Sequence, residues 1–343
     1  MVLLAVLQSH LGNRSTETTD LKAPLIQGLD TNTISAIELG SSGQEVTLKR
    51  TPDGFVVANK ENYPAVYSKI NNLITSCVDI EVRDLITKNP QNHEDLEVTE
   101  SKSKNVVKFL DKDDKLITGV VIGKRNEQGQ TFVRRIGSDE VYLSDNPGWL
   151  QMSATSYIDK DIYKVDKEKI ARVTVSSPGE SYTIKRGPDN KIVLDNIPAG
   201  KKVKGTDYES VFTAITNLTA ADVQKETQDL KFDMTYICKL KDSTICTFKL
   251  AKKGTKTYAK CNAQFTDTGK IVISKEESKE ELEKKEAKLL ARDEAAKFTQ
   301  KHKGWVYEIA SWQSDNMTKK LSDLLEEIKK EEAPKKPPAI PNK

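Results

Sequence analysis

Three histidines and four cysteines are the residues of this 343-residue chain best suited to metal binding or nucleophilic chemistry. The histidines are His10, His93 and His302, which stand in a polar stretch, a loop and the border of a charged helix. A metal site needs three or four converging ligands, and the sequence has no HxH, HExxH or CxxC spacing. It also has no G-x-S-x-G elbow and no glycine-rich phosphate loop. We therefore expect no catalytic residue, no metal site and no cofactor.

Two of the cysteines, Cys246 and Cys261, flank the pair Lys253-Gly254, which predicts a hairpin turn. If those two residues form the turn, Cys246 lies directly across from Cys261, where Cβ atoms are about 4.5–5.5 Å apart. We predict that the two are neighbours, and that they form a disulfide in an oxidising compartment. Cys77 and Cys238 fall at apolar positions and are expected to be buried.

An aromatic segment, residues 305–312, contains Trp305, Tyr307 and Trp312. Binding proteins use such rings to contact sugars, peptides or protein partners. Rings of this kind also lock a terminal strand onto a core. Both interpretations of the segment remain open at this point.

The elements that carry these residues belong to a repeat. The segment from Thr33 to Val57 recurs from Lys169 at a constant offset of 136 residues (33 to 169). Each copy predicts a three-strand meander with turns at fixed positions. The copies share Lys49-Arg50 and Lys185-Arg186, which we weigh as an anion-binding surface or as a solvated strand edge.

Each meander is followed by a helical pattern and then by further strands. Apolar residues recur at helical spacing from Val66 to Cys77 and from Tyr208 to Leu218. Thr206 and Glu209 have the spacing of a capping box. The predicted fold class is α+β, with two tandem repeats that are each an antiparallel sheet packed by one helix. A charged helix is expected near the C-terminus, and a final amphipathic helix is expected over 317–328.

Charge, hydropathy and the repeat together indicate which partners the chain can have and how it divides into parts. The interspersed charges, 54 basic against 51 acidic residues, argue against a nucleic-acid surface. The apolar run from Val2 to Leu7 is too short to span a bilayer, so it is either an ordinary terminus or the end of a truncated membrane anchor. The expected parts are a tether or anchor at 1–30, a first repeat at 31–152, a connection at 153–168, a second repeat at 169–328 with a charged helical insertion at 274–303, and a disordered Pro/Lys tail at 329–343.

From about Thr33 to Ile328 the sequence resembles the bacterial domain of unknown function 4340 family. The resemblance rests on the repeated strand–turn–strand and on three further segments, which are IGKRNEQGQTFVRRIGSDEVYL, SYIDKDIYKVDKEKIARVTV and GWVYEIASWQSDNM. It implies an extracytoplasmic protein in the cell envelope, on the periplasmic side, tethered by an N-terminal membrane anchor when full-length. It also implies a gene often found beside gliding-type ABC transporters.

We therefore expect a non-enzymatic binding or scaffold protein, an accessory to an ABC-transporter-type envelope complex, with no nucleic-acid partner. The alternative is a carbohydrate- or peptide-binding module that uses the aromatic segment 305–312. A third hypothesis, an enzyme of unrecognised class, would require a cleft holding two or more acidic residues with displaced pKa values.

Overall fold

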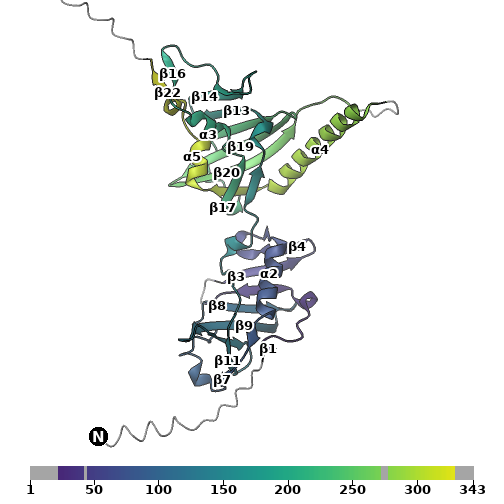
Figure 1. Ribbon diagram of the computed structural model, residues 1–343, viewed down its shortest axis with the longest axis vertical. Coiled ribbons are helices and arrows are strands. Elements are labelled where there is room, and N and C mark those ends of the chain that lie inside the picture. The colour runs from purple at the N-terminus through teal and green to yellow at the C-terminus, as the bar shows by residue number, and fades with distance from the viewer. Residues whose placement is uncertain (1–21, 42–44, 272–276, 329–343) are drawn as a thin grey trace, which may run out of the picture. The chain divides into compact units, whose positions relative to one another are not determined.

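The computed structural model describes residues 22–41, 45–271 and 277–328. The chain divides after Asp159 into two compact units, residues 1–159 and 160–343 (Figure 1). Each unit is built on a nine-stranded antiparallel sheet with few helices, which confirms the α+β class. Most of the predicted tether or anchor at 1–30, and all of the tail at 329–343, lie outside the described residues.

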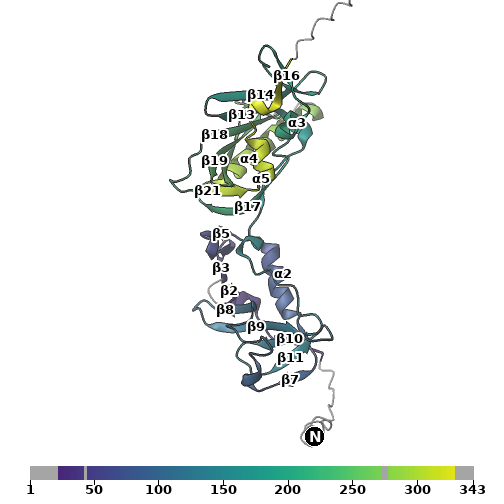
Figure 2. The same ribbon diagram turned by 90° about the vertical axis from the view of Figure 1, so that its left-hand side faces the viewer.

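In the first unit the strands of the large sheet lie in the order β5-β4-β3-β2-β8-β9-β10-β11-β7 (Figure 2). The strands are β2 (Ala36–Leu39), β3 (Val46–Thr51), β4 (Gly54–Val57), β5 (Tyr63–Pro64), β7 (Leu85–Thr87), β8 (Asn105–Leu110), β9 (Leu116–Arg125), β10 (Thr131–Arg135) and β11 (Val141–Ser144). A separate two-stranded sheet pairs β1 (Ala23–Pro24) with β6 (Glu81–Val82). The predicted meander is β2-β3-β4.

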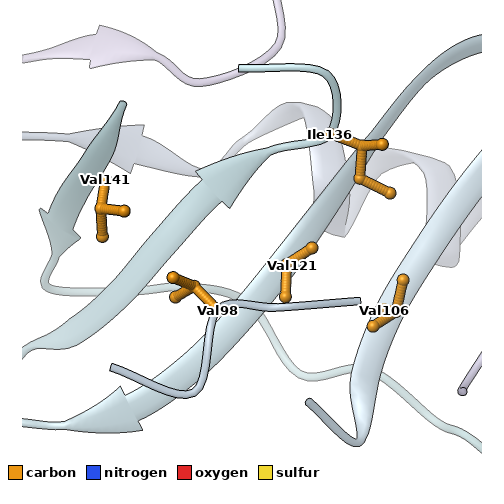
Figure 3. Close-up of a cluster of buried hydrophobic side chains, with 5 residues drawn as sticks. All are labelled: Val98, Val106, Val121, Ile136 and Val141. Carbon is orange, nitrogen blue, oxygen red and sulfur yellow. The ribbon is translucent and has the colours of Figure 1, made fainter. Parts of the chain in front are cut away.

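The core of the first unit lies on both faces of this sheet. On one face, α2 (Tyr67–Val78) buries the predicted stripe Ile70, Leu73, Ile74 and Cys77. On the other face, the segment between β7 and β8 crosses the sheet and places Val98 in a second cluster (Figure 3). The buried members of that cluster are Val98, Val106, Val121, Ile136 and Val141.

This crossing segment approaches the sheet closely at Gly123 in β9. A Cβ atom at Gly123 would lie 2.3 Å from the backbone oxygen of Leu96 and 2.7 Å from Val98 Cγ1. Backbone cannot move aside as a flexible side chain does, so Gly123→Ala is expected to destabilise the first unit by about 1–3 kcal/mol. Chemical denaturation, monitored through hydrogen exchange of the backbone amides of β8 and β9, measures this loss of stability.

The control for Gly123 is its neighbour Lys124, whose side chain is exposed and whose backbone N–H donates to Leu96 O at 3.2 Å. Lys124→Ala keeps that backbone bond, and we expect it to change stability by less than about 0.5 kcal/mol. An equally small effect of Gly123→Ala would contradict the close approach.

In the second unit the strand order is β12-β17-β21-β20-β19-β18-β13-β14-β15. The strands are β12 (Asp161–Lys164), β13 (Ile170–Ser177), β14 (Glu180–Arg186), β15 (Ile192–Leu194), β17 (Asn217–Lys225), β18 (Met234–Leu240), β19 (Thr244–Lys253), β20 (Lys256–Phe265) and β21 (Trp305–Ile309). The short strands β16 (Lys201–Val203) and β22 (Leu325–Glu327) form a separate pair.

The helices of the second unit are α3 (Asp207–Phe212), α4 (Lys279–His302) and α5 (Ser311–Met317). The charged helix forms within the predicted range, and Ser278 and Glu281 close a capping box at its start. It runs beside β19 and β20 (Figure 1) and buries Ala291 and Ala295. Small residues at these two positions let the helix backbone come close to the sheet.

Two predicted helices are wrong in extent. The helical pattern from Tyr208 to Leu218 ends at Phe212, and Leu218 lies in β17. The side chain of Thr206 makes no capping hydrogen bond. In place of a helix over 317–328, residues Leu321–Leu324 form a 3-10 turn and β22 follows, because Leu325 to Glu327 pair with β16. In both cases strand pairing with a distant segment overrides the local helical pattern.

The arginines of the two basic pairs donate hydrogen bonds to backbone oxygens. Arg50 Nε donates to Ile34 O at 2.6 Å, and its Nη2 donates to Thr31 O at 2.9 Å. Arg186 Nε donates to Ile170 O at 3.3 Å, and its Nη2 donates to Lys167 O at 2.7 Å. Each guanidinium therefore ties a strand to the 3-10 turn before its meander.

Candidate functional site

The aromatic segment 305–312 is mostly part of the core of the second unit. Trp305 is 8% exposed and Tyr307 is 1% exposed, whereas Trp312 is 69% exposed. The Lys225 ammonium lies 3.3 Å from the centre of the Trp305 ring. Trp305 and Tyr307 thus fix β21, and of the three predicted contact residues Trp312 alone presents its ring to solvent.

Trp312 stands in the first turn of α5, which is anchored through the residue after it. Gln313 Nε2 donates to Asn217 O at 2.7 Å, and Gln313 is 2% exposed. The position of the indole is therefore set by a buried hydrogen bond to β17. No groove is formed by Trp305, Tyr307 and Trp312 together, because two of the rings are enclosed.

The cysteine register predicted from the sequence is wrong by two residues. Cys246 lies across from Ala263, and Cys261 lies across from Phe248. The turn is Gly254-Thr255, since Lys253 pairs with Lys256 and Gly254 has φ +61°. Glycine at the first central position is what a type II′ turn requires. The proposed Cys246–Cys261 disulfide is absent, and all four cysteines are free thiols.

The direct neighbour of Cys246 across the sheet is Cys238 on β18. Cys246 Sγ donates a hydrogen bond to Tyr163 Oη at 3.1 Å. Cys246, Tyr163 and Phe298 line a cavity of about 320 Å³ that lies between β12, the neighbouring strands of the sheet and α4. Sequence reasoning missed Tyr163, because nothing in the sequence shows that β12 pairs with β17.

Burial holds the Cys246 thiol and the Tyr163 hydroxyl in their neutral forms. Burial raises the pKa of the Cys246 thiol to about 11, and burial also raises the pKa of Tyr163 far above its usual range. A nucleophilic cysteine needs a lowered pKa, since the thiolate is the reactive form. The cavity therefore opposes nucleophilic chemistry at Cys246.

The same burial predicts slow reaction of all four cysteines with thiol reagents. Burial raises the pKa of Cys77 to about 12 and raises the pKa values of Cys238 and Cys261 further. We expect negligible labelling of the native protein at about pH 8, and labelling of four thiols after unfolding without a reductant. Mass spectrometry counts the labels, and only two labels on the unfolded chain would reveal a disulfide.

On the face of the second sheet away from α4, Lys185 of the repeated basic pair lies in a row with two further cations, Arg172 and Lys239. Arg172 on β13 lies directly opposite both Lys185 on β14 and Lys239 on β18. Lys185 pairs with Asp195 at 2.9 Å. Like charges directly across a sheet are destabilising, and one carboxylate accompanies three cations here. Helix α4 covers the opposite face, where Cys246 lies.

Within residues 22–41, 45–271 and 277–328, no group of three or more His, Cys, Asp or Glu side chains gathers as a metal site would require. His93 is 6% exposed, and its Nε2 lies 3.0 Å from Asp139 O. His302 is buried and its Nδ1 shares a hydrogen bond of 2.6 Å with Tyr307 Oη. No helix among the described residues is both long enough and apolar enough to span a bilayer.

This geometry defines an α+β protein with two units, each built on a nine-stranded antiparallel sheet. Within that class, a family model described as "Domain of unknown function (DUF4340)" matches residues 56–234, more than half of the chain. The chain belongs to the DUF4340 family, as the resemblance implied. No curated protein and no solved structure matches the chain at a significant level.

Proposed function

We propose that this chain is a non-enzymatic binding or scaffold protein of the cell envelope, held on the extracytoplasmic side. Its partner is an ABC-transporter-type complex, an assignment that comes from the family resemblance alone. The observation that carries a binding role is the row Arg172, Lys185 and Lys239 on the sheet face away from α4, where one carboxylate, Asp195, accompanies three cations. A partner surface rich in carboxylates would relieve the repulsion within the row.

We further infer that the two units descend from one duplicated module. Read from the meander outward, β4-β3-β2-β8-β9-β10-β11-β7 has the same order as β15-β14-β13-β18-β19-β20-β21-β17. Arg50 and Arg186, which are 136 positions apart (50 to 186), donate to carbonyls at the same offset. Duplication produces two similar surfaces, which suits a spacer or binding protein, and it creates no active site by itself.

Cross-linking in cells tests the partner. Full-length protein carrying Arg172→Glu and Lys239→Glu should recover fewer cross-linked transporter subunits than the unaltered protein, by about tenfold or more. The control carries two reversals on the helix that covers the opposite face, Lys297→Glu and Lys284→Glu, and has the same net charge. Equal recovery from both variants, or the consistent absence of transporter subunits, would remove the proposal.

Cells that produce the unaltered full-length protein also test its location. The outer layer of the cells is permeabilised while the inner membrane is left intact, and protease is then added. The protease should digest an extracytoplasmic protein while a cytoplasmic marker survives. Survival of the chain together with the marker would contradict an envelope location.

The alternative, a carbohydrate- or peptide-binding module at 305–312, keeps one supporting observation, the exposed ring of Trp312. Burial of Trp305 and Tyr307 counts against a groove there. Trp312→Ala would abolish ligand binding under this alternative and would leave recovery of a transporter partner unchanged.

A further inference from the structure

A groove in the first unit runs between α2 and residues 148–157. It has a volume of about 370 Å³, which lies within the range of small-molecule sites. Asn72, Thr75 and Ser76 line it from the helix, and Trp149 and Gln151 line it from the facing segment. Neither the sequence analysis nor the family match assigns any role to these residues.

The wall opposite the helix is fixed at both ends. Gly148 has φ +76°, and a Cβ atom there would lie 2.8 Å from Ser76 O, so the chain packs directly on the end of α2. At the far end, the Val66 N–H donates to Tyr157 O at 2.8 Å. Tyr157 Oη donates to Gln151 O at 2.6 Å within the segment. The groove is therefore preformed and does not depend on ligand to order it.

Trp149 is 84% exposed, more than any other large apolar side chain in the described part of the chain. The exposed face of an indole stacks well on the C–H face of a sugar ring. Leu73, the aliphatic residue of the same lining, is only 4% exposed, so the indole is not part of a broad exposed apolar patch. A membrane surface or an apolar helix would need such a patch.

The polar groups around Trp149 are neutral donors and acceptors. Within the described residues, the side-chain amides of Asn72 and Gln151 make no hydrogen bond. The one charged residue of the lining, Lys69, donates from its ammonium to Ile158 O at 3.3 Å. Among the residues that the structure describes, no carboxylate lines the groove. This chemistry matches hydroxyl-rich, uncharged ligands better than anionic or cationic ones.

We propose that this groove binds an uncharged oligosaccharide. One sugar ring stacks on the indole of Trp149, and the hydroxyls of that ring and its neighbour bond to the amides of Asn72 and Gln151 and to the hydroxyl of Ser76. Gly148 is a positioning residue, because it sets the indole beside the end of α2. The site lies wholly in the first unit and is separate from Trp312.

Calorimetric titration of the full chain with three neutral tetrasaccharides, cellotetraose, maltotetraose and tetra-N-acetylchitotetraose, tests the proposal. At least one should bind with a dissociation constant in the millimolar range or tighter. Trp149→Ala should weaken that binding by at least about tenfold. The matched control is Trp312→Ala, which removes another exposed indole and should leave the affinity within about twofold.

Both tryptophan variants should keep the melting temperature of the unaltered protein, since each removes a mostly exposed ring. The proposal is overturned if none of the three tetrasaccharides binds, or if Trp149→Ala binds as well as the unaltered chain. It is also overturned if Trp312→Ala alone loses binding, which would place the sugar site in the second unit. Tetraalanine is titrated in parallel as a neutral peptide probe. If it binds more tightly than every sugar, the groove is a peptide site and the proposal is overturned.

Discussion

Phe248→Ala is expected to lower the free energy of unfolding of the second unit by about 3–5 kcal/mol. Phe248 is fully buried at the centre of β19. Its ring meets Tyr163 edge-on at a centroid distance of 6.0 Å and meets Tyr236 at 6.3 Å. The substitution removes a large apolar volume and two aromatic contacts, and strands on both sides of β19 prevent the sheet from closing the void.

The adjacent residue Lys249 provides the control for Phe248. It is exposed on the other face of the same strand, so Lys249→Ala should change stability by less than about 0.5 kcal/mol. Guanidinium denaturation followed by hydrogen exchange at β18 to β20 separates this unit from the first. A loss below about 1 kcal/mol for Phe248→Ala would show that the ring does not occupy the core described here.

Arg186→Ala is expected to destabilise the second unit by about 2–4 kcal/mol. Its side chain is 9% exposed and donates to the backbone oxygens of Ile170, Lys167 and Asn190. The guanidinium also lies 5.5 Å from the centre of the Phe212 ring. Alanine leaves these carbonyls without their charged donor. Arg186→Lys should recover only part of the loss, because an ammonium lacks the planar fork that reaches several acceptors at once.

Lys185 precedes Arg186 and points to the opposite face, where it pairs with Asp195 at 39% side-chain exposure. Lys185→Ala should cost no more than about 1 kcal/mol, since exposed ion pairs contribute little. In the first unit, Arg50→Ala should produce the smaller loss of the two arginine variants, because Arg50 donates to two carbonyls. Equal effects of Arg186→Ala and Lys185→Ala in urea denaturation would contradict the assigned contacts.

The meanders and the helix α2 were predictable because their signals are local. Alternating apolar residues flank Pro-Asp turns at Pro52 and Pro188, and the stripe from Ile70 to Cys77 follows helical spacing without interruption. Each of these elements forms as predicted. The strand order that joins them could not be deduced, since pairing between β2 and β8, or between β13 and β18, links residues far apart in sequence.

The hairpin register failed for a specific reason. A glycine in a two-residue turn can occupy the first or the second central position, and the sequence Lys253-Gly254-Thr255 permits both. The second position was assumed, whereas Gly254 takes the first. Moving the turn by one residue shifts every cross-strand pair by two, which replaced Cys261 by Ala263 as the neighbour of Cys246.

The candidate sites were less predictable than the fold. Composition identified Trp305, Tyr307 and Trp312 as aromatic residues, but only their burial shows which rings hold β21 in place. The cation row required the pairing of β14, β13 and β18. Trp149 lies in a segment with no periodic pattern, and its role depends on the packing of Gly148 against α2.

The most direct test of the duplicated architecture is an experimental structure of the full chain, with the two units superposed on each other. We predict that β4-β3-β2-β8-β9-β10-β11-β7 will overlay β15-β14-β13-β18-β19-β20-β21-β17 in order and direction, with Arg50 and Arg186 at equivalent positions. Two sheets with different strand orders, or arginines that donate to unrelated carbonyls, would contradict the account.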